Sequence, residues 1–200
     1  MSIQWVFFDL GSTLIDESDC YRSRIDEIVT ANRIDREAFV SCVDRFAKEN
    51  AFPIKAAAEQ YGVPVPTWPS DLEKPYPGTR KLLERLSERY RLGIIANQAA
   101  GAPRRLEKWG IRDYFDVIIT SAEVGFSKPD RRIFEMALRQ ADCLSANAVM
   151  IGDRIDNDIL PAKQLGMKTV WVRQGFARLQ PDSDRPDHTI HSLEEINSIL

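Results

Sequence analysis

The sequence predicts an α/β fold in which helices cover both faces of an open parallel sheet. Five short apolar runs have the length and the continuous apolar character of buried parallel strands: Trp5–Phe8, Leu92–Ala96, Val117–Thr120, Val149–Ile151 and Thr169–Val172. Helix-like segments lie between the later runs, at Arg80–Tyr90, Pro103–Trp109, Arg131–Ala141 and Asp156–Gly166. Strands that alternate with helices in this way are typical of a sheet covered on both faces.

The chain between the first and second strands departs from this alternation. Apolar residues at three- and four-residue spacing predict helices at Cys20–Asn32 and Arg36–Asn50, and a third helix is expected around Ile54–Tyr61. The proline-rich stretch Val63–Pro77 then leads back to the sheet. The sequence therefore predicts a helical insertion over residues 16–75, within an α/β core formed by residues 1–15 and 76–200.

Composition narrows the class of protein. Of the 200 residues, 44% are hydrophobic and 28% are charged, and the net charge is −3, as is usual for a globular protein. Basic pairs are scattered among acids, so we expect no nucleic-acid partner, and no apolar stretch is long enough for a membrane span. The first residues lack the basic region of a signal peptide, and the three cysteines are widely spaced. Both features predict a cytoplasmic protein with reduced thiols.

Polar residues follow four of the expected strands. Asp9 follows the first, Asn97 the second, Thr120 and Ser121 end the third, and Asp153 follows the fourth. In an open parallel sheet, ligands bind in the crevice outside the carboxyl ends of the strands. We therefore expect two carboxylates and an amide to converge there, although any one of them alone is more typical of a turn or a helix cap.

Four segments resemble, in chain order, the motifs of the haloacid dehalogenase (HAD) superfamily. Phe7–Leu14 (F-F-D-L-G-S-T-L) is similar to the first motif, and Leu92–Gln98 lies where the second belongs. Gly125–Asp130 (G-F-S-K-P-D) resembles the third, and Met150–Ile159 (M-I-G-D-R-I-D-N-D-I) resembles the fourth. The resemblance covers the whole chain. It implies a Rossmann-like core with the C1 helical cap of subfamily I inserted after the first strand.

The resemblance implies a magnesium-dependent phosphatase that acts on a small phosphorylated metabolite. Asp9 would attack phosphorus and form an aspartyl phosphate, which water then hydrolyses. Asp9, the backbone carbonyl of Gly11 and Asp153 would bind Mg²⁺, because this hard ion prefers oxygen ligands. Asp158 would support the metal site.

The same resemblance assigns residues to the phosphate. Lys128 would pair with Asp9 and with a phosphoryl oxygen, which stabilises negative charge in the ground and transition states. Thr13, four residues after the nucleophile, and Asn97, at the end of the second strand, would be further phosphate contacts.

The sequence departs from the family pattern at two positions. Most HAD phosphatases have a second aspartate two residues after the nucleophile, where it acts as general acid and base, but this chain has Gly11. The usual serine or threonine at the end of the second strand is Ala96. Loss of a general acid or base typically lowers the rate by ~10²–10⁴-fold. Asp16 or Glu17 could supply the missing group if the chain folds back over the site.

These departures leave two alternatives open. Carbon–halogen hydrolysis needs no acid for its halide leaving group, but haloacid dehalogenases place an aromatic residue at the position of Gly11 and lack a metal ligand such as Asp153. A HAD-like binding or regulatory module would retain the phosphate site without turnover. In either case the cap would select the ligand. Tyr21, Arg22, Arg24 and Trp68 are the candidates for lining its pocket. The sequence carries no signal of oligomeric state.

Overall fold

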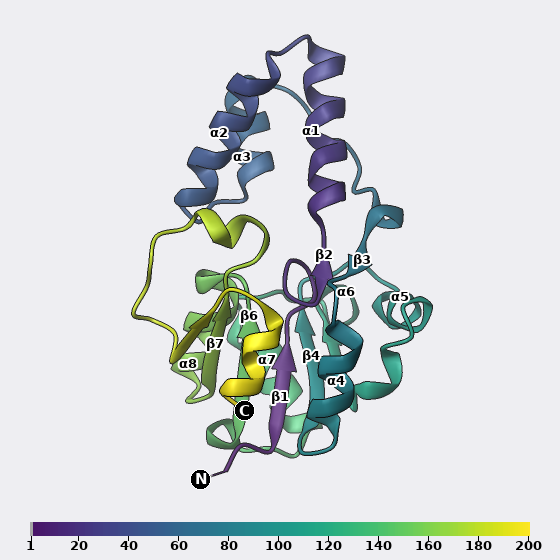
Figure 1. Ribbon diagram of the computed structural model, residues 1–200, viewed down its shortest axis with the longest axis vertical. Coiled ribbons are helices and arrows are strands. Elements are labelled where there is room, and N and C mark those ends of the chain that lie inside the picture. Colours follow the sequence, from purple (N-terminus) through teal and green to yellow (C-terminus); the bar gives the residue numbers. More distant parts are fainter. Residues whose placement is uncertain (1) are drawn as a thin grey trace.

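The computed structural model describes residues 2–200 and has a six-stranded parallel sheet at its centre (Figure 1). The strand order is β5-β4-β1-β6-β7-β8, so the first strand of the chain lies inside the sheet. All five predicted strands are present, to within one residue at each end. The six strands are β1 (Trp5–Phe8), β4 (Arg91–Ala96), β5 (Val117–Thr120), β6 (Ala148–Gly152), β7 (Lys168–Val172) and β8 (His188–Ile190).

Strand β1 shows why helices cover both faces of the sheet. All four of its residues are buried, and successive side chains point to opposite faces. Val6 and Phe8 pack into an apolar cluster with α4 (Thr79–Ser87), α5 (Ala102–Lys108) and the 3₁₀ helix Leu193–Ser198. Trp5 and Phe7 pack on the other face with α7 (Arg131–Gln140) and α8 (Leu160–Gln164). The predicted α/β fold is confirmed.

Short elements account for most differences from the sequence prediction. Strand β8 was not expected, because it lies at the sheet edge and only Ile190 of its three residues is buried. The helix expected at Asp156–Gly166 is a π-helical turn, Ile155–Ile159, followed by α8. The remaining short helices are α6 (Ser121–Val124) and the 3₁₀ turns Ser70–Leu72, Arg112–Tyr114, Ser145–Asn147 and Gly175–Leu179.

Three helices form a separate layer above the carboxyl ends of the strands (Figure 1). This helical layer consists of α1 (Ser18–Asn32), α2 (Arg36–Lys48) and α3 (Pro53–Tyr61), all within residues 16–75. It has its own apolar core, in which Ile28, Phe39 and Ala57 are almost fully buried. Residues 2–200 contain no helix whose length and hydropathy would suit a segment that spans a bilayer.

A pair of short strands and the side chain of Arg154 are two of the connections that join the helical layer to the sheet core. The chain leaves and returns through an antiparallel pair of two-residue strands, β2 (Ile15–Asp16) and β3 (Lys74–Pro75). On the opposite side, the guanidinium of Arg154 donates to the backbone carbonyls of Asn50 (2.9 Å) and Ala51 (3.2 Å), between α2 and α3. The first turn of α1 and the loop around Asn50 are thereby held over the sheet.

Candidate active site

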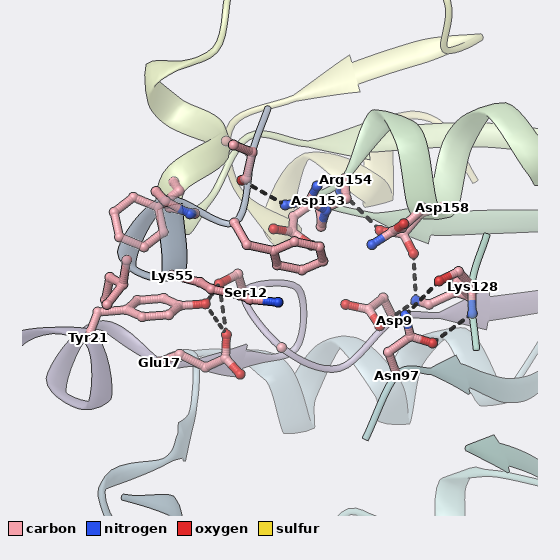
Figure 2. A pocket seen from close by; sticks show the side chains of 18 of the residues that line it. Asp9, Ser12, Glu17, Tyr21, Lys55, Asn97, Lys128, Asp153, Arg154 and Asp158 are labelled. Atoms are coloured by element: carbon pink, nitrogen blue, oxygen red, sulfur yellow. Dashed lines mark hydrogen bonds and ion pairs between the residues drawn. The ribbon is translucent and has the colours of Figure 1, made fainter. Parts of the chain in front are cut away.

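A cavity of about 470 Å³ lies between the strand ends and the helical layer (Figure 2). Asp9 after β1, Asn97 after β4 and Asp153 after β6 line its core side. Lys128, from the loop before α7, lies beside them. The strand ends therefore bring together residues from the first, second and fourth motif-like segments. The loop before α7 adds Lys128 from the third segment.

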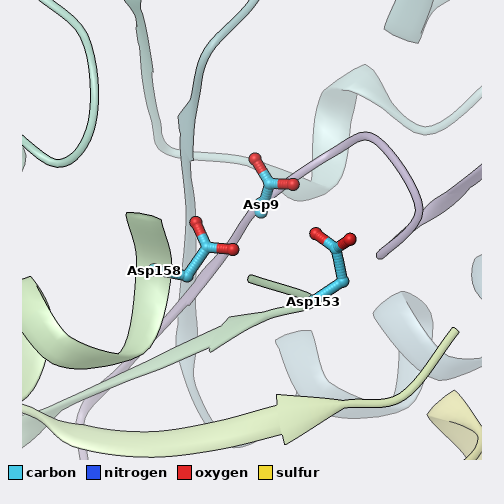
Figure 3. Close-up of side chains that lie close together, drawn as sticks. All are labelled: Asp9, Asp153 and Asp158. Carbon is cyan, nitrogen blue, oxygen red and sulfur yellow. The ribbon is translucent and has the colours of Figure 1, made fainter. Parts of the chain in front are cut away.

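Three carboxylates face one another in this cavity, those of Asp9, Asp153 and Asp158 (Figure 3). Each offers an oxygen, and these three oxygens lie within 4.8 Å of one another. Gly152 makes this approach possible, because a Cβ at that position would collide with the carboxylate of Asp158. In the G-D pair of the fourth segment, Gly152 thus leaves room for Asp158, and Asp153 supplies a carboxylate to the cluster.

Lys128 is the cation of the cluster. Its side chain is 3% exposed, and Nζ donates to Oδ1 of Asp9 (2.6 Å) and to Oδ1 of Asp158 (2.5 Å). Burial alone would lower the pKa of Lys128, but the charges of Asp158 and Asp9 outweigh it and raise that pKa above its ordinary value. Lys128 therefore carries its charge at neutral pH.

Asp158 holds Lys128 and the loop after β6 in place. One of its oxygens accepts from Lys128, and the other accepts from the backbone N–H of Arg154 at 2.9 Å. The side chain is almost fully buried. This arrangement leaves Asp158 with little freedom and holds Lys128 beside Asp9.

Asn97 lines the cavity and also fixes the backbone of Lys128. Its Oδ1 accepts from the N–H of Lys128 at 2.7 Å, and its Nδ2 donates to the carbonyl of the same residue at 2.9 Å. One N–H of the Asn97 amide is not used by these two contacts. Asn97 can therefore position the lysine and still donate one hydrogen bond into the cavity.

The charge balance of the cluster suits a hard cation. Lys128 offsets part of the negative charge of Asp9, Asp153 and Asp158, but among residues 2–200 Asp153 has no ion-pair partner at its carboxylate. Burial, followed by the charges of Asp158 and Asp9, raises the pKa of Asp153 well above its ordinary value. Closely spaced carboxylate oxygens with an excess of negative charge are the donors that Mg²⁺ or a similar ion prefers.

The structure does not bring Thr13 to the cavity with the other residues assigned to the phosphate. Its side chain is fully buried, its Oγ1 has no hydrogen-bond partner among the described residues, and it does not line the cavity. The loop after Asp9 turns the neighbouring Ser12 toward the cavity instead. The role of Thr13 as a phosphate contact therefore stays a prediction, and the position of its side chain does not support it.

The two acids after the first motif have different environments. Asp16 accepts from the backbone N–H of Ser18 at 2.9 Å and does not line the cavity. Glu17 lines the cavity and is 9% exposed. Its Oε2 accepts from the hydroxyl of Tyr21 at 2.6 Å and from that of Ser12 at 3.0 Å (Figure 2). Of the two candidates, only Glu17 is at the site.

Burial governs the acidity of Glu17. Loss of contact with water raises the pKa of this carboxyl group from 4.5 to about 7, and the nearby charge of Asp9 acts in the same direction. The hydrogen bond from Tyr21 opposes this rise without cancelling it. Glu17 therefore gains and loses a proton near neutral pH.

The helical layer supplies part of the cavity wall. Of the three candidates from the cap, Tyr21 and Arg24 line it, whereas Arg22 is exposed and pairs with Asp19. Trp68 lies behind the wall, where its ring packs under the guanidinium of Arg24 at 4.9 Å from the ring centroid. Trp68 therefore supports the wall and does not line it.

Other wall residues carry no motif that would single them out in the sequence. Phe52 and Ile54 come from the start of α3, and Phe176 comes from the 3₁₀ turn after β7. Phe52 is 59% exposed and directly precedes Pro53, the first residue of α3. These apolar rings come together at the cavity only because the α2–α3 loop lies over the core.

Comparisons with known proteins identify the family of this chain. The family model described as haloacid dehalogenase-like hydrolase matches residues 6–172. A glyceraldehyde 3-phosphate phosphatase of Methanocaldococcus jannaschii is 30% identical, and the match covers 99% of this chain and 97% of the relative. A pyrimidine 5'-nucleotidase of Escherichia coli is 38% identical over 63% of this chain, and there the match spans 56% of the relative's length.

Solved structures share the whole architecture. A HAD phosphatase from Thermococcus onnurineus aligns over 98% of this chain and 97% of its own, with a TM-score of 0.70 and 25% identity. A HAD-hydrolase of Bacillus subtilis, described as putative and bound to magnesium, has the same fold, with a TM-score of 0.74 and 19% identity over 100% of this chain and 99% of its own. With motifs, sheet and family model in agreement, the chain belongs to the haloacid dehalogenase-like hydrolases.

Proposed function

We propose that this chain is a magnesium-dependent phosphatase that hydrolyses a small phosphomonoester through an aspartyl phosphate on Asp9. The observation that carries the proposal is the contact between Asp9 and Lys128 at the cavity. One oxygen of Asp9 accepts from Lys128, and no group within residues 2–200 donates to the other. A carboxylate with one oxygen held and one free is suited to attack phosphorus in line.

The charges at the site support this chemistry. Lys128 neutralises Asp9 in part, so that an anionic phosphate can approach an anionic nucleophile. Asp9, Asp153 and the backbone carbonyl of Gly11 would hold Mg²⁺, with Asp158 orienting Lys128 beside them. When bound, the ion would supply the positive charge that the cluster lacks.

The substrate would be a small metabolite with one phosphate group. Relatives of this chain are named for glyceraldehyde 3-phosphate, phosphoserine and pyrimidine nucleotides. A cavity of about 470 Å³ accommodates molecules of that size. Residues 16–75 would act as the cap that selects among them, because Tyr21 and Arg24 from this segment line the same cavity as Asp9.

A phosphatase assay with magnesium tests the proposal. Para-nitrophenyl phosphate and a panel of triose phosphates, phosphoserine and nucleoside monophosphates would be incubated with the wild type and with Asp9→Asn. We expect phosphate release by the wild type and none by Asp9→Asn, since an amide cannot act as the nucleophile. Asp113→Asn is the control, because Asp113 is exposed and remote from the cavity. Equal rates for the wild type and Asp9→Asn would contradict the covalent mechanism.

A further inference from the structure

The space beside Gly11 is filled by the carboxyl group of Glu17. A Cβ built on Gly11 would lie 2.5 Å from Oε1 of Glu17, 2.9 Å from its Cδ and 2.9 Å from its Oε2. The carboxyl oxygens of an aspartate lie about 2.4 Å from its own Cβ, as covalent geometry requires. Glu17 therefore brings a carboxyl group into the space that a side chain at position 11 would need.

The backbone conformation at position 11 does not require a glycine. Gly11 has no positive φ, so its conformation is open to any residue. What excludes a side chain there is the carboxyl group of Glu17, which is held by hydrogen bonds and not free to swing away. Gly11 thus makes room for a group that arrives from six residues further along the chain.

The hydrogen bonds of Glu17 leave one carboxyl oxygen free to carry or accept a proton. Oε2 accepts from both Ser12 and Tyr21, and Tyr21 lies one turn along α1. No group within residues 2–200 donates to Oε1, which is also the oxygen nearest to the Cβ position of Gly11. A proton on this carboxyl group would therefore sit on Oε1, because Oε2 already accepts two hydroxyls.

We propose that Glu17 is the general acid and base of the reaction, in place of the side chain that Gly11 lacks. This inference rests on the proposed phosphatase function. As Asp9 forms its bond to phosphorus and the ester P–O bond breaks, the Glu17 carboxyl gives its proton to the departing alkoxide. The Glu17 carboxylate then takes a proton from water as that water attacks the aspartyl phosphate and the bond between Asp9 and phosphorus breaks. Alcohol and phosphate leave, and both side chains return to their starting states.

Dependence on the leaving group tests the proposal. An alkoxide needs a proton in the transition state, whereas nitrophenolate needs almost none, so Glu17→Gln should slow the two substrates unequally. We expect a loss of ~10²–10⁴-fold with the alkyl phosphate that the wild type hydrolyses fastest, measured as kcat/KM. The loss of phosphorylation rate with para-nitrophenyl phosphate, measured as the burst of nitrophenolate, should be at least tenfold smaller.

Glu73→Gln is the matched control, because Glu73 is as buried as Glu17 but does not line the cavity. We expect this variant to keep the wild-type ratio of alkyl to aryl rates. Equal losses on both substrates in Glu17→Gln would overturn the proposal, since they indicate a structural role.

Moving the carboxylate back to position 11 gives a second test. Gly11→Asp alone should be impaired, because the new side chain meets Glu17. The double variant Gly11→Asp with Glu17→Ala removes that conflict and should hydrolyse the alkyl phosphate at least tenfold faster than Glu17→Ala alone. A folded double variant without this gain would overturn the proposal.

The proposed function and this inference fail in different ways. If the wild type releases phosphate and Asp9→Asn does not, the phosphatase function stands whatever Glu17→Gln shows. A wild type without any phosphate release would overturn both the function and the inference.

Discussion

Gly11 and Glu17 act together to provide a general acid and base. Glu17 supplies the carboxyl group, and Gly11 leaves the space for it. The sequence suggests a defect at Gly11, because the expected aspartate is missing there. In the structure, the carboxyl group of Glu17 lies against the Cβ position of residue 11 and is held by Tyr21 and Ser12. The absence of a side chain at position 11 is therefore the condition for Glu17 to reach the site.

The buried carboxyl group of Glu17 should make stability depend on pH. Its pKa is raised from 4.5 to about 7 by burial, so the folded state binds the proton more tightly than the unfolded state. Below pH 4.5 the Glu17 carboxyl is protonated in both the folded and the unfolded state, so the free energy of unfolding does not change. Above pH 7 the group is charged in both states, and the folded state bears the full cost of burying that charge. That cost is about 3 kcal/mol in the free energy of unfolding.

Glu17→Gln removes this charge and should gain stability relative to the wild type as the pH rises. We expect the difference in Tm between the two proteins to increase from pH 5 to pH 8 when both are melted in the presence of a chelator. A difference that stays constant over this range would show that Glu17 does not titrate with a raised pKa.

At the scale of elements, buried strands were easier to predict than short pairings. The apolar runs that form β1, β4, β5, β6 and β7 are continuous, because both faces of each strand are covered. The pair β2 and β3 has two residues in each strand and no apolar pattern that a sequence could reveal. These two short strands nevertheless set where α1 begins, and so where Glu17 lies.

Arg154 connects two elements that are distant in the chain. Its guanidinium donates to the carbonyls of Asn50 and Ala51, and it lies over the ring of Phe52 at 4.3 Å from the centroid. Arg154→Met should loosen the α2–α3 loop while leaving the sheet intact. Hydrogen exchange should then be faster for amides 49–55 and unchanged in β6.

Arg36→Met is a suitable control for this prediction, because Arg36 pairs with Asp26 on the exposed side of the helical layer. It should leave exchange in the α2–α3 loop as in the wild type. Unchanged protection of amides 49–55 in Arg154→Met would show that the loop is held by other contacts.

On the scale of the whole molecule, the site is where the sheet and the helical layer meet. The sequence could predict Asp9, Asn97 and Asp153 there, because strand ends converge in this class of fold. It could predict Lys128 only through the resemblance of Gly125–Asp130 to a family motif. It could not place Phe52, since the position of the α2–α3 loop depends on long-range packing. For the same reason, the choice between Asp16 and Glu17 required the structure.

The carboxylate cluster should make stability depend on magnesium. A ligand that binds only the folded state raises stability by about 2.7 kcal/mol at a concentration 100 times its Kd. We expect magnesium with beryllofluoride to raise the Tm of the wild type, and Asp153→Asn to lose most of that shift. Asp113→Asn should keep it. An undiminished shift in Asp153→Asn would place the ion elsewhere.

The most direct test of the account is to look for phosphate on Asp9 in Glu17→Gln. With para-nitrophenyl phosphate and magnesium, the variant should still form the aspartyl phosphate, because nitrophenolate leaves without a proton. Attack by water should be slow without the base, so the intermediate should accumulate. Acid quenching and peptide mass spectrometry should show a phosphoryl group on Asp9 at a higher occupancy than in the wild type. Continued turnover of Glu17→Gln with no phosphoryl group on Asp9 would contradict the account.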